Sequence, residues 1–213
     1  MIRIKICIFL AFIGVYTTSY AQTDAKKVIN KVSSAFNQAG GIQADFSIQF
    51  LKQGKPQRNS QGQICIKASK FALKTPDTAS WFDGKTLWTY MASSEEVNVS
   101  SPTHEELLGI NPYLILNNYR NEYDCSLGSK TSYQQIAIYE LRLIPIKKRY
   151  DIATITLYVN KQTYQPLFIE LMHNNGYTSR FIIHSYKTKQ TFDDNIFKFN
   201  TLEYPSAEVI DLR

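Results

Sequence analysis

Residues 81–91, WFDGKTLWTYM, hold both tryptophans of the chain and have the pattern of two short strands joined by an Asp-Gly turn. An Asp-Gly pair between apolar runs favours a hairpin, because the turn needs a positive φ that glycine adopts without a steric penalty. Apolar residues nevertheless stand at adjacent positions, Trp81 beside Phe82 and Leu87 beside Trp88, instead of alternating with polar ones. We expect one face of the hairpin to pack inside the protein and the other to be partly covered, with its aromatic rings tolerating water at one edge.

Strand-like segments surround this hairpin. Residues 42–50, IQADFSIQF, alternate apolar and polar side chains, as in a strand with one buried face. An Asn-Asn-Gly step at residues 174–176 favours another hairpin turn. Further strands are predicted at residues 62–67, 70–75, 95–100, 122–127, 133–144, 152–160, 166–173, 178–188 and 195–200. Because so many antiparallel strands in one sheet must curl or close, the sequence predicts a mainly β fold and one domain over residues 22–213.

Residues 24–41 have helical rather than strand-like periodicity. Asp24 is positioned to cap the start of this helix, and the Gly-Gly pair at residues 40–41 marks its end. The apolar residues expected on its buried face are Val28, Ile29, Val32, Ala35 and Phe36.

Residues 100–119 interrupt the series of strands and predict two short helices. Thr103 and Glu106 have the spacing of a capping box, and Asn111 precedes a proline suited to the first turn of a helix. Helices this short are not stable alone, so we expect them to pack against the hollow of the curved sheet. Periodicity does not separate a solid core from an apolar pocket with a lid. The apolar residues of the two predicted helices are Leu107, Leu108, Ile110, Tyr113, Leu114, Ile115 and Leu116.

The N-terminus and the composition suggest an exported protein. Residues 1–21 have the basic start, apolar middle and small-residue end of a signal peptide, with cleavage expected after Ala21. No cysteine lies at this junction, so we expect a soluble rather than a lipid-anchored product. The formal net charge of +6 comes from scattered side chains, which makes nucleic-acid binding a weak interpretation. Export permits a disulfide between Cys65 and Cys125, but their strand-like surroundings favour two buried thiols.

The sequence holds no recognisable catalytic constellation. The HEELL segment at residues 104–108 lacks the second histidine of a zinc-protease helix, so His104 is expected on a helix surface. His173 and His184 fall on separate predicted strands, and the Asp-Asp pair at residues 193–194 is typical of a turn with capping residues. We therefore expect a protein that is not an enzyme and that uses no metal or cofactor.

Several motifs, in their order along the chain, resemble the LolA family of periplasmic lipoprotein carriers. The most specific is DGKTLW at residues 83–88 together with Tyr90, which is similar to a signature run of that family. The segments ADFSIQF at 44–50, INPYLIL at 110–116 and FKFNTLEYPSAEVIDLR at 197–213 resemble its first strand, its second lid helix and its C-terminal run. The resemblance extends over nearly the whole chain after residue 24.

This resemblance implies an unclosed antiparallel β-barrel, a half-barrel whose apolar cavity is stoppered by lid helices and receives the acyl chains of lipoproteins. The implied partners are acylated lipoproteins, a releasing transporter in the inner membrane and an outer-membrane receptor, with the carrier itself a monomer in the periplasm. A lipid or glycolipid shuttle, or an envelope regulatory or sensor module, remains an alternative on the same fold. The residues expected to line the cavity are Phe46, Ile48, Phe50, Phe71, Leu73, Trp81, Trp88 and Tyr90, and those expected in the lid are Leu107, Leu108, Ile110, Tyr113 and Leu114.

The chain departs from the family pattern at two positions. Lys67 stands where the family commonly has an arginine that holds the lid, and an ammonium group lacks the fork geometry of guanidinium. Leu73 replaces a family aromatic residue, which implies smaller groups in the cavity. The resemblance makes Lys67 the candidate lid anchor, with lid control that differs from the family.

Overall fold

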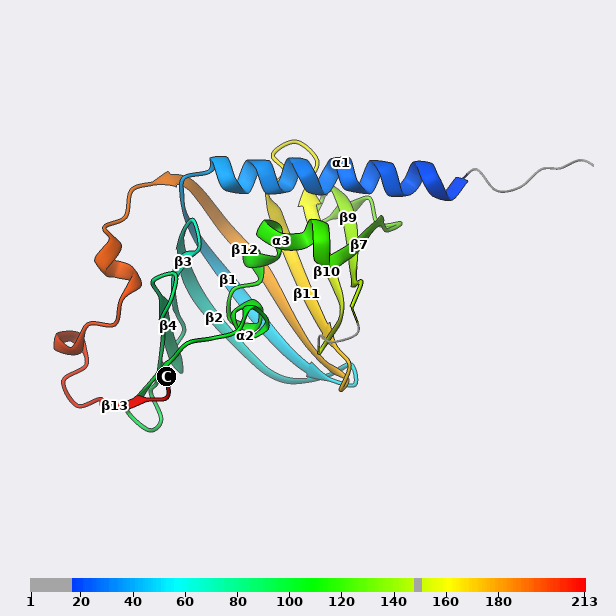
Figure 1. The fold of residues 1–213 in the computed structure, drawn as a ribbon. Coiled ribbons are helices and arrows are strands. Elements are labelled where there is room, and N and C mark those ends of the chain that lie inside the picture. The colour runs from blue at the N-terminus through cyan, green and yellow to red at the C-terminus, as the bar shows by residue number, and fades with distance from the viewer. Residues whose placement is uncertain (1–16, 148–150) are drawn as a thin grey trace, which may run out of the picture.

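A computed structural model describes residues 17–147 and 151–213, in which one curved sheet partly surrounds a set of helices (Figure 1). The strands are β1 (Gly41–Lys52), β2 (Lys55–Lys67), β3 (Lys70–Lys74), β4 (Thr78–Phe82), β5 (Leu87–Met91), β6 (Glu96–Ser100), β7 (Tyr123–Leu127), β8 (Ser132–Tyr133), β9 (Ile136–Pro145), β10 (Ile152–Asn160), β11 (Pro166–His173), β12 (Tyr177–Gln190) and β13 (Glu208–Asp211).

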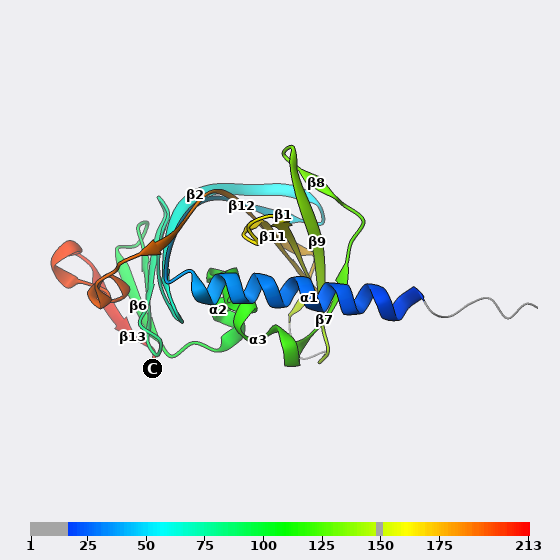
Figure 2. The same ribbon diagram turned by 90° about the horizontal axis from the view of Figure 1, so that it is seen from above.

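The order of strands across the sheet is β13-β6-β5-β4-β3-β2-β1-β12-β11-β10-β9-β7, and β8 pairs with β9 off this path. Among the described residues, every strand pairing is antiparallel except that of β13 with β6. Seen from above, the sheet bends around the helices and leaves one side open (Figure 2). The predicted mainly β fold, an unclosed antiparallel half-barrel, is confirmed.

The first strand shows why the sheet has one buried face. In β1, Ile42, Ala44, Phe46 and Ile48 are buried, whereas the polar residues between them are half-buried. This two-residue period directs one set of side chains toward the helices and the other away from them. β1 pairs along its length with β2 on one side and β12 on the other, so it lies in the middle of the curved sheet.

The helix α1 (Thr17–Gln38) lies across one end of the half-barrel (Figure 1). It buries Val28, Ile29, Val32 and Phe36, as predicted, and leaves Ala35 half-buried. Gly40, at φ +70°, ends the helical segment in the left-handed conformation that glycine favours.

The start of α1 differs from the prediction. The helix begins before Asp24, so this residue lies inside it and is not its N-cap; its carboxylate instead accepts a hydrogen bond from Lys27 Nζ at 3.5 Å. The predicted cleavage site after Ala21 falls within α1, and residues 1–16 of the predicted signal peptide lie outside the described residues. Within the described part of the chain, no helix is both long and apolar enough to span a membrane.

Three short helical segments lie on the concave side of the sheet: α2 (His104–Ile110), η1 (Pro112–Leu114) and α3 (Ile115–Glu122) (Figures 1 and 2). The predicted capping box is present: the Thr103 hydroxyl accepts from the Glu106 backbone N–H, and the Glu106 carboxylate accepts from the Thr103 N–H. The Asn111 side chain accepts from the Tyr113 N–H at 3.2 Å and so caps η1. Local sequence therefore sets the starts of α2 and η1, as predicted, whereas α3, a third helical segment, has no side-chain cap.

The C-terminal segment, residues 191–207, covers the convex side of β3, β4 and β5. Ala72, Ala79, Trp81 and Phe197 form a second, smaller core there, separate from the main core on the concave side. The second face of the hairpin at residues 81–91 is therefore covered by a distant part of the chain. Aromatic side chains that pack against this core are Trp88, Tyr90, Phe192, Phe199 and Tyr204.

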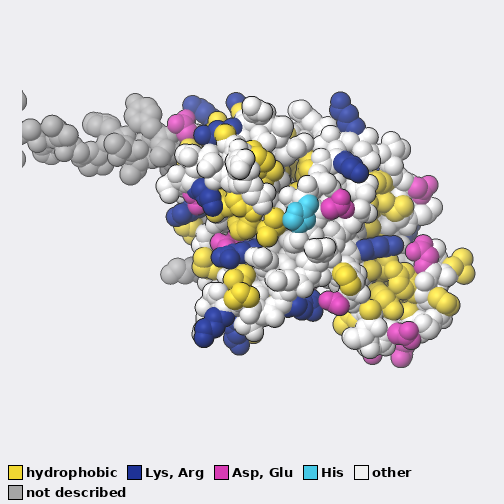
Figure 3. Space-filling view, turned by 180° about the vertical axis from the view of Figure 1, so that it is seen from behind, with side chains coloured by type: hydrophobic (Ala, Val, Ile, Leu, Met, Phe, Trp, Pro, Cys, Tyr) yellow, Lys and Arg dark blue, Asp and Glu magenta, His cyan; other side chains and the backbone are white. Residues whose placement is uncertain are grey.

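The prediction of a strand at residues 195–200 is wrong. Asp193 caps a short 3-10 helix, η2 (Asp194–Phe197), by accepting from the Asn195 N–H at 2.8 Å, and a second one, η3 (Thr201–Glu203), follows. The chain becomes extended only at β13. Figure 3, which views the convex side, shows hydrophobic side chains gathered over the C-terminal part of the chain, where Leu202 of η3 and Val209 of β13 are exposed.

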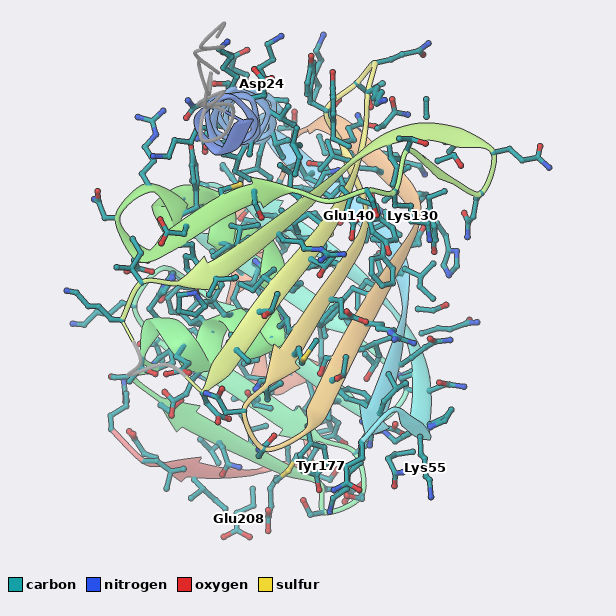
Figure 4. All side chains as sticks on the ribbon, turned by 90° about the vertical axis from the view of Figure 1, so that its right-hand side faces the viewer. Asp24, Lys55, Lys130, Glu140, Tyr177 and Glu208 are labelled. Atoms are coloured by element: carbon teal, nitrogen blue, oxygen red, sulfur yellow. The ribbon has the colours of Figure 1, made fainter. Side chains whose placement is uncertain are left out.

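A helix lies at one end of the half-barrel and strand turns lie at the other. Figure 4 shows Asp24 of α1 at the first end and the turns near Lys55 and Tyr177 at the second. These two turns are joined, because the Gln53 N–H donates to the Gly176 carbonyl at 2.8 Å. Gly176 has φ +81°, which confirms the predicted turn at residues 174–176.

Cys65 and Cys125 are free thiols, as the sequence favoured, but of the two predicted buried thiols only Cys125 is buried. Cys125 is buried in the main core, where desolvation raises its pKa to about 12, and Cys65 packs half-buried against the smaller core on the other side of the sheet. Because the sheet separates them, the two thiols belong to different packing environments.

Candidate binding cavity

A cavity of about 190 Å³ lies between the concave face of the sheet and α2. Part of its wall is apolar and part carries hydroxyl groups and a guanidinium. The residues that line it are Phe46, Ile48, Phe50, Arg58, Ser60, Leu73, Thr75, Thr78, Ser80, Thr89, Gly109, Ile110 and Phe181.

Strand register brings these side chains to one face. Ile48 of β1 stands opposite Phe181 of β12, and the rings of Phe46 and Phe181 lie 6.0 Å apart. On the other side of the cavity, β3 and β4 place Leu73 opposite Ser80. Since directly opposite residues of neighbouring strands point to the same face, the cavity wall is continuous from β12 to β5.

The helix α2 borders the cavity on the open side of the sheet through Gly109 and Ile110. A second space of about 10 Å³ shares Phe46, Leu73, Ile110 and Phe181 with the first, and Tyr113 also lines it. The main core, which includes the concave face, also contains the predicted lid residues Leu107, Leu108, Tyr113 and Leu114. Ile110 is half-buried and contacts both spaces.

The structure brings four of the eight predicted cavity residues to the cavity: Phe46, Ile48, Phe50 and Leu73. Phe71 lies in the same main core but is fully buried against Phe82, with ring centroids 5.6 Å apart. Phe71 therefore belongs to the packed core on the concave side and is not among the residues that line the cavity.

Trp81, Trp88 and Tyr90 lie on the opposite face of the sheet, and their placement in the cavity is corrected. Trp81 packs against Phe199 at 5.5 Å and against Tyr204 at 5.4 Å between ring centroids. The reason is the two-residue period: Trp81 alternates with the cavity residue Ser80 and so points to the convex side.

Sequence reasoning missed the polar wall and Phe181. Register supplies the signal for the wall, because Ser60 pairs with Ile48 and Thr89 pairs with Ser80. The run that contains Phe181 has apolar residues at adjacent positions, so its inward face is ambiguous without the pairing. The other missed residues of the polar wall are Arg58, Thr75 and Thr78.

Lys67 does not contact the lid, which corrects its expected role as a lid anchor. Its Nζ donates to the Phe192 carbonyl at 3.1 Å and to the Asp194 carboxylate at 2.8 Å. Hydrogen bonds from Lys67 and Lys70 lower the pKa of Asp194 to about 2. Lys67 is one residue away from the inward-facing Ile66, so its side chain reaches the convex side and holds the C-terminal segment there.

The histidines are dispersed. His104 Nε2, at the start of α2, lies 3.7 Å from Glu122 Oε2, at the end of α3, and both atoms are buried without a hydrogen bond to any described residue. His173 faces Asp151, and His184 Nε2 lies 2.6 Å from the Ser47 hydroxyl on the convex side. In the part of the chain that the structure describes, no three histidine, cysteine or acidic side chains cluster as metal ligands.

A buried carboxylate, Glu140, is also fully engaged in structural contacts. It accepts from the Lys130 N–H at 2.8 Å and pairs with Arg142 at 3.0 Å, and Figure 4 shows Glu140 and Lys130 close together at the edge formed by β9. These interactions lower its pKa against the effect of burial. The cavity is therefore the strongest candidate for a functional site among these features.

Several solved structures are similar to this chain, and one of them, with a TM-score of 0.59, supports the same fold. A solved structure of an uncharacterized conserved protein from Thermus thermophilus is 13% identical, with a TM-score of 0.59 over 88% of this chain and 99% of that one. A putative outer membrane lipoprotein-sorting protein domain from Vibrio parahaemolyticus is 10% identical, with a TM-score of 0.49 over 85% of this chain and 99% of that one. A LolA superfamily protein from Nitrosomonas europaea is 15% identical, with a TM-score of 0.47 over 82% and 97% of the two chains.

No curated protein sequence matches the chain significantly. The family model described as outer membrane lipoprotein carrier protein LolA matches residues 15–175, most of the chain. With the half-barrel, the lid helices and the cavity beneath them, this match identifies the chain as a member of the LolA family of outer membrane lipoprotein carrier proteins.

Proposed function

We propose that this protein is a periplasmic carrier that shields the acyl chains of lipoproteins and transfers them from the inner to the outer membrane. The observation that carries the proposal is the cavity beneath α2, whose apolar wall includes Phe46, Ile48, Phe50 and Phe181. Such a carrier performs no covalent chemistry: binding needs only apolar area, at about 0.8 kcal/mol for each buried methylene.

The volume of the cavity supports loading by displacement of the lid. About 190 Å³ is available in the closed structure, below the roughly 300–1,000 Å³ typical of small-molecule sites. Lipoprotein acyl chains therefore require the lid to move, which exposes the space that its own apolar residues fill. Leu107, Leu108 and Leu114 act in this proposal as an internal substitute for the ligand.

This competition explains how a carrier releases its cargo. The free energy gained by burying acyl chains is partly offset by the loss of lid packing, so net affinity stays within a reversible range. The partners in this proposal are an inner-membrane transporter that loads the chains and an outer-membrane receptor that removes them. The proposal also includes export through a signal peptide that is cleaved and a carrier that acts as a monomer.

The decisive experiment is to purify the native protein from an envelope extract and identify co-purified molecules by mass spectrometry. Triacylated proteins in the bound fraction support the carrier. Phospholipid or glycolipid alone would instead identify a lipid shuttle, and a stoichiometric unacylated protein would identify a regulatory module.

A pair of matched variants tests the lid in the same assay. Leu107→Asp places a charge in the buried lid, where Leu107 is 7% exposed, and we expect it to alter the retained lipid. Leu202→Asp makes the same chemical change at a residue that is 87% exposed and should leave the lipid load as in the wild type. An unchanged load in both variants would count against a lid over the acyl site.

A further inference from the structure

The cavity wall has two chemically different parts. β1, β12 and α2 contribute mainly apolar side chains, whereas the part from β2 to β5 contributes one apolar residue, Leu73, together with Arg58 and five hydroxyl-bearing residues, Ser60, Thr75, Thr78, Ser80 and Thr89. Ser80 of β4 and Thr89 of β5 occupy inward-facing positions, and the next inward positions of these two strands hold Phe82 and Leu87. A site for hydrocarbon alone has no use for such a polar wall.

Two of the five hydroxyls are already engaged. The Thr75 hydroxyl donates to the Thr78 carbonyl at 3.1 Å and accepts from the Thr78 N–H at 3.0 Å, and the two hydroxyls lie 3.1 Å apart. These bonds shape the turn between β3 and β4. Their contribution is therefore structural.

The other three hydroxyls are available to a ligand. Within the described residues, those of Ser60, Ser80 and Thr89 form no hydrogen bond with the protein. Ser80 is only 4% exposed, and it stands directly opposite Thr89 in the pairing of β4 with β5, which brings two donors side by side. Among the described residues, neither hydroxyl is a fully buried atom without a partner, so both are open to the cavity space, where a ligand that brings hydrogen-bond acceptors can take the place of water.

The charges near the cavity favour neutral acceptors over an anionic group. Arg58 is the one cationic side chain among the residues that line it, and its guanidinium already lies 3.9 Å from the Asp77 carboxylate and 5.2 Å from the ring centroid of Phe50. A phosphate at this position would meet the Asp77 charge as well. Ester carbonyls accept from hydroxyls without that repulsion.

We propose that Ser80 and Thr89, with Ser60 across the cavity, form a subsite for the ester carbonyls of a diacylglyceryl group. This inference rests on the proposed acyl-binding function and specifies which part of the lipid the polar wall recognises. The two acyl chains then extend from β4 and β5 toward Ile110 and Tyr113, where the adjoining small space lies. The polar wall thus fixes the direction in which the lipid enters.

The test compares two synthetic lipopeptides that differ only in the linkage of their chains. One carries dipalmitoylglyceryl-cysteine, and the other carries the dihexadecyl ether analogue, which has the same chain length but no ester carbonyl. Binding to the full protein is measured by fluorescence titration for the wild type and for the Ser80→Ala/Thr89→Val double variant. Thr156→Val is the control, because Thr156 alternates with buried Ile155 and Leu157 and so faces away from the hollow.

We expect the double variant to bind the ester lipopeptide about tenfold more weakly, with less than a twofold change for the ether analogue. Equal affinities of the two lipopeptides for the wild type, or an equal loss of both in the double variant, would overturn the ester subsite. If neither lipopeptide binds the wild type, the acyl-binding function itself fails. A parallel titration with dipalmitoyl phosphatidylglycerol tests which lipids use the subsite. If the double variant also loses affinity for this phospholipid, phospholipid shares the subsite; if its affinity is unchanged, the subsite is restricted to lipoproteins.

Thermal melting confirms that each variant is folded before binding is compared. Ser80→Ala alone, which removes one small hydroxyl, provides a second variant if the double substitution is unstable. Its loss of affinity for the ester lipopeptide is expected to be about threefold.

Discussion

Shortening Leu108 to alanine separates the energetics of the lid from those of the rest of the core. Leu108 lies in α2 and is 0% exposed, so its truncation is expected to lower the free energy of unfolding by about 2–5 kcal/mol. In the loaded state that we propose, α2 has moved away from the concave face and most contacts of Leu108 are already lost. The substitution therefore destabilises the closed, empty protein more than the loaded one.

This difference makes the variant bind acyl chains more tightly. If the substitution destabilises the empty protein by about 1 kcal/mol more than the loaded protein, the apparent dissociation constant falls about fivefold. A difference of about 2 kcal/mol lowers it about thirtyfold. A titration with a fluorescent fatty-acyl probe measures this change. Urea unfolding of the same preparation, followed by circular dichroism, measures the accompanying loss of stability.

Phe197→Ala is the control for a general loss of stability. Phe197 is also 0% exposed, but it belongs to the core on the convex side, and its truncation is expected to cost about 3–5 kcal/mol. We expect no change in its affinity for the probe. Equal affinities for wild type, Leu108→Ala and Phe197→Ala, with all three folded, would refute the idea that lid packing competes with the ligand.

Three further predictions concern other parts of the molecule. Gly62→Ala places a Cβ 2.6 Å from the backbone oxygen of Lys74, so we expect a loss of about 1–3 kcal/mol in urea unfolding, and an unchanged midpoint would contradict this close approach. The folded pKa of Asp194, about 2, lies below its unfolded value of about 3.9, so its stabilisation is present above that unfolded value and lost as pH falls toward 2. Asp194→Asn should therefore unfold more easily than the wild type at neutral pH, with the difference disappearing in acid; a constant difference would argue against the ion pairs. Burial raises the pKa of both Cys65 and Cys125, so alkylation mapped by mass spectrometry should be slow at both in the native protein and complete in denaturant, and rapid labelling of Cys125 in the native state would show that its core is open.

Local signals in the sequence predicted part of the concave side, namely the inward face of β1 and the starts of α2 and η1. The alternation in residues 42–50 predicts the inward face of β1, and the capping residues Thr103 and Asn111 predict where α2 and η1 begin. Both signals depend only on residues that are close in the sequence, so they can be recognised without knowing how the rest of the chain folds. The four predicted cavity residues that line the cavity include three from this single strand, Phe46, Ile48 and Phe50.

The convex side was not predictable in the same way. Apolar residues at adjacent positions in residues 81–91 indicate two covered faces, but they do not say which segment covers the second one. The cover comes from residues more than a hundred positions away, where Asp193 caps a 3-10 helix in a stretch whose alternation suggested a strand. Local capping prevailed over periodicity there, and Phe197 is fully buried in the turn conformation that η2 adopts.

The two covers of the sheet are held by different kinds of interaction, which determines which of them opens. On the convex side, β13 pairs with β6, the Leu212 N–H donates to the Val99 carbonyl at 2.8 Å, and ion pairs to Asp194 add to the burial of Phe197. On the concave side, α2 has only seven residues, and a helix this short depends on packing for its stability. When an acyl chain replaces that packing, α2 is free to leave while the convex cover keeps its backbone and ionic contacts. In the proposed function, we therefore expect loading to open the half-barrel on its concave side without disturbing the segment that covers its convex face.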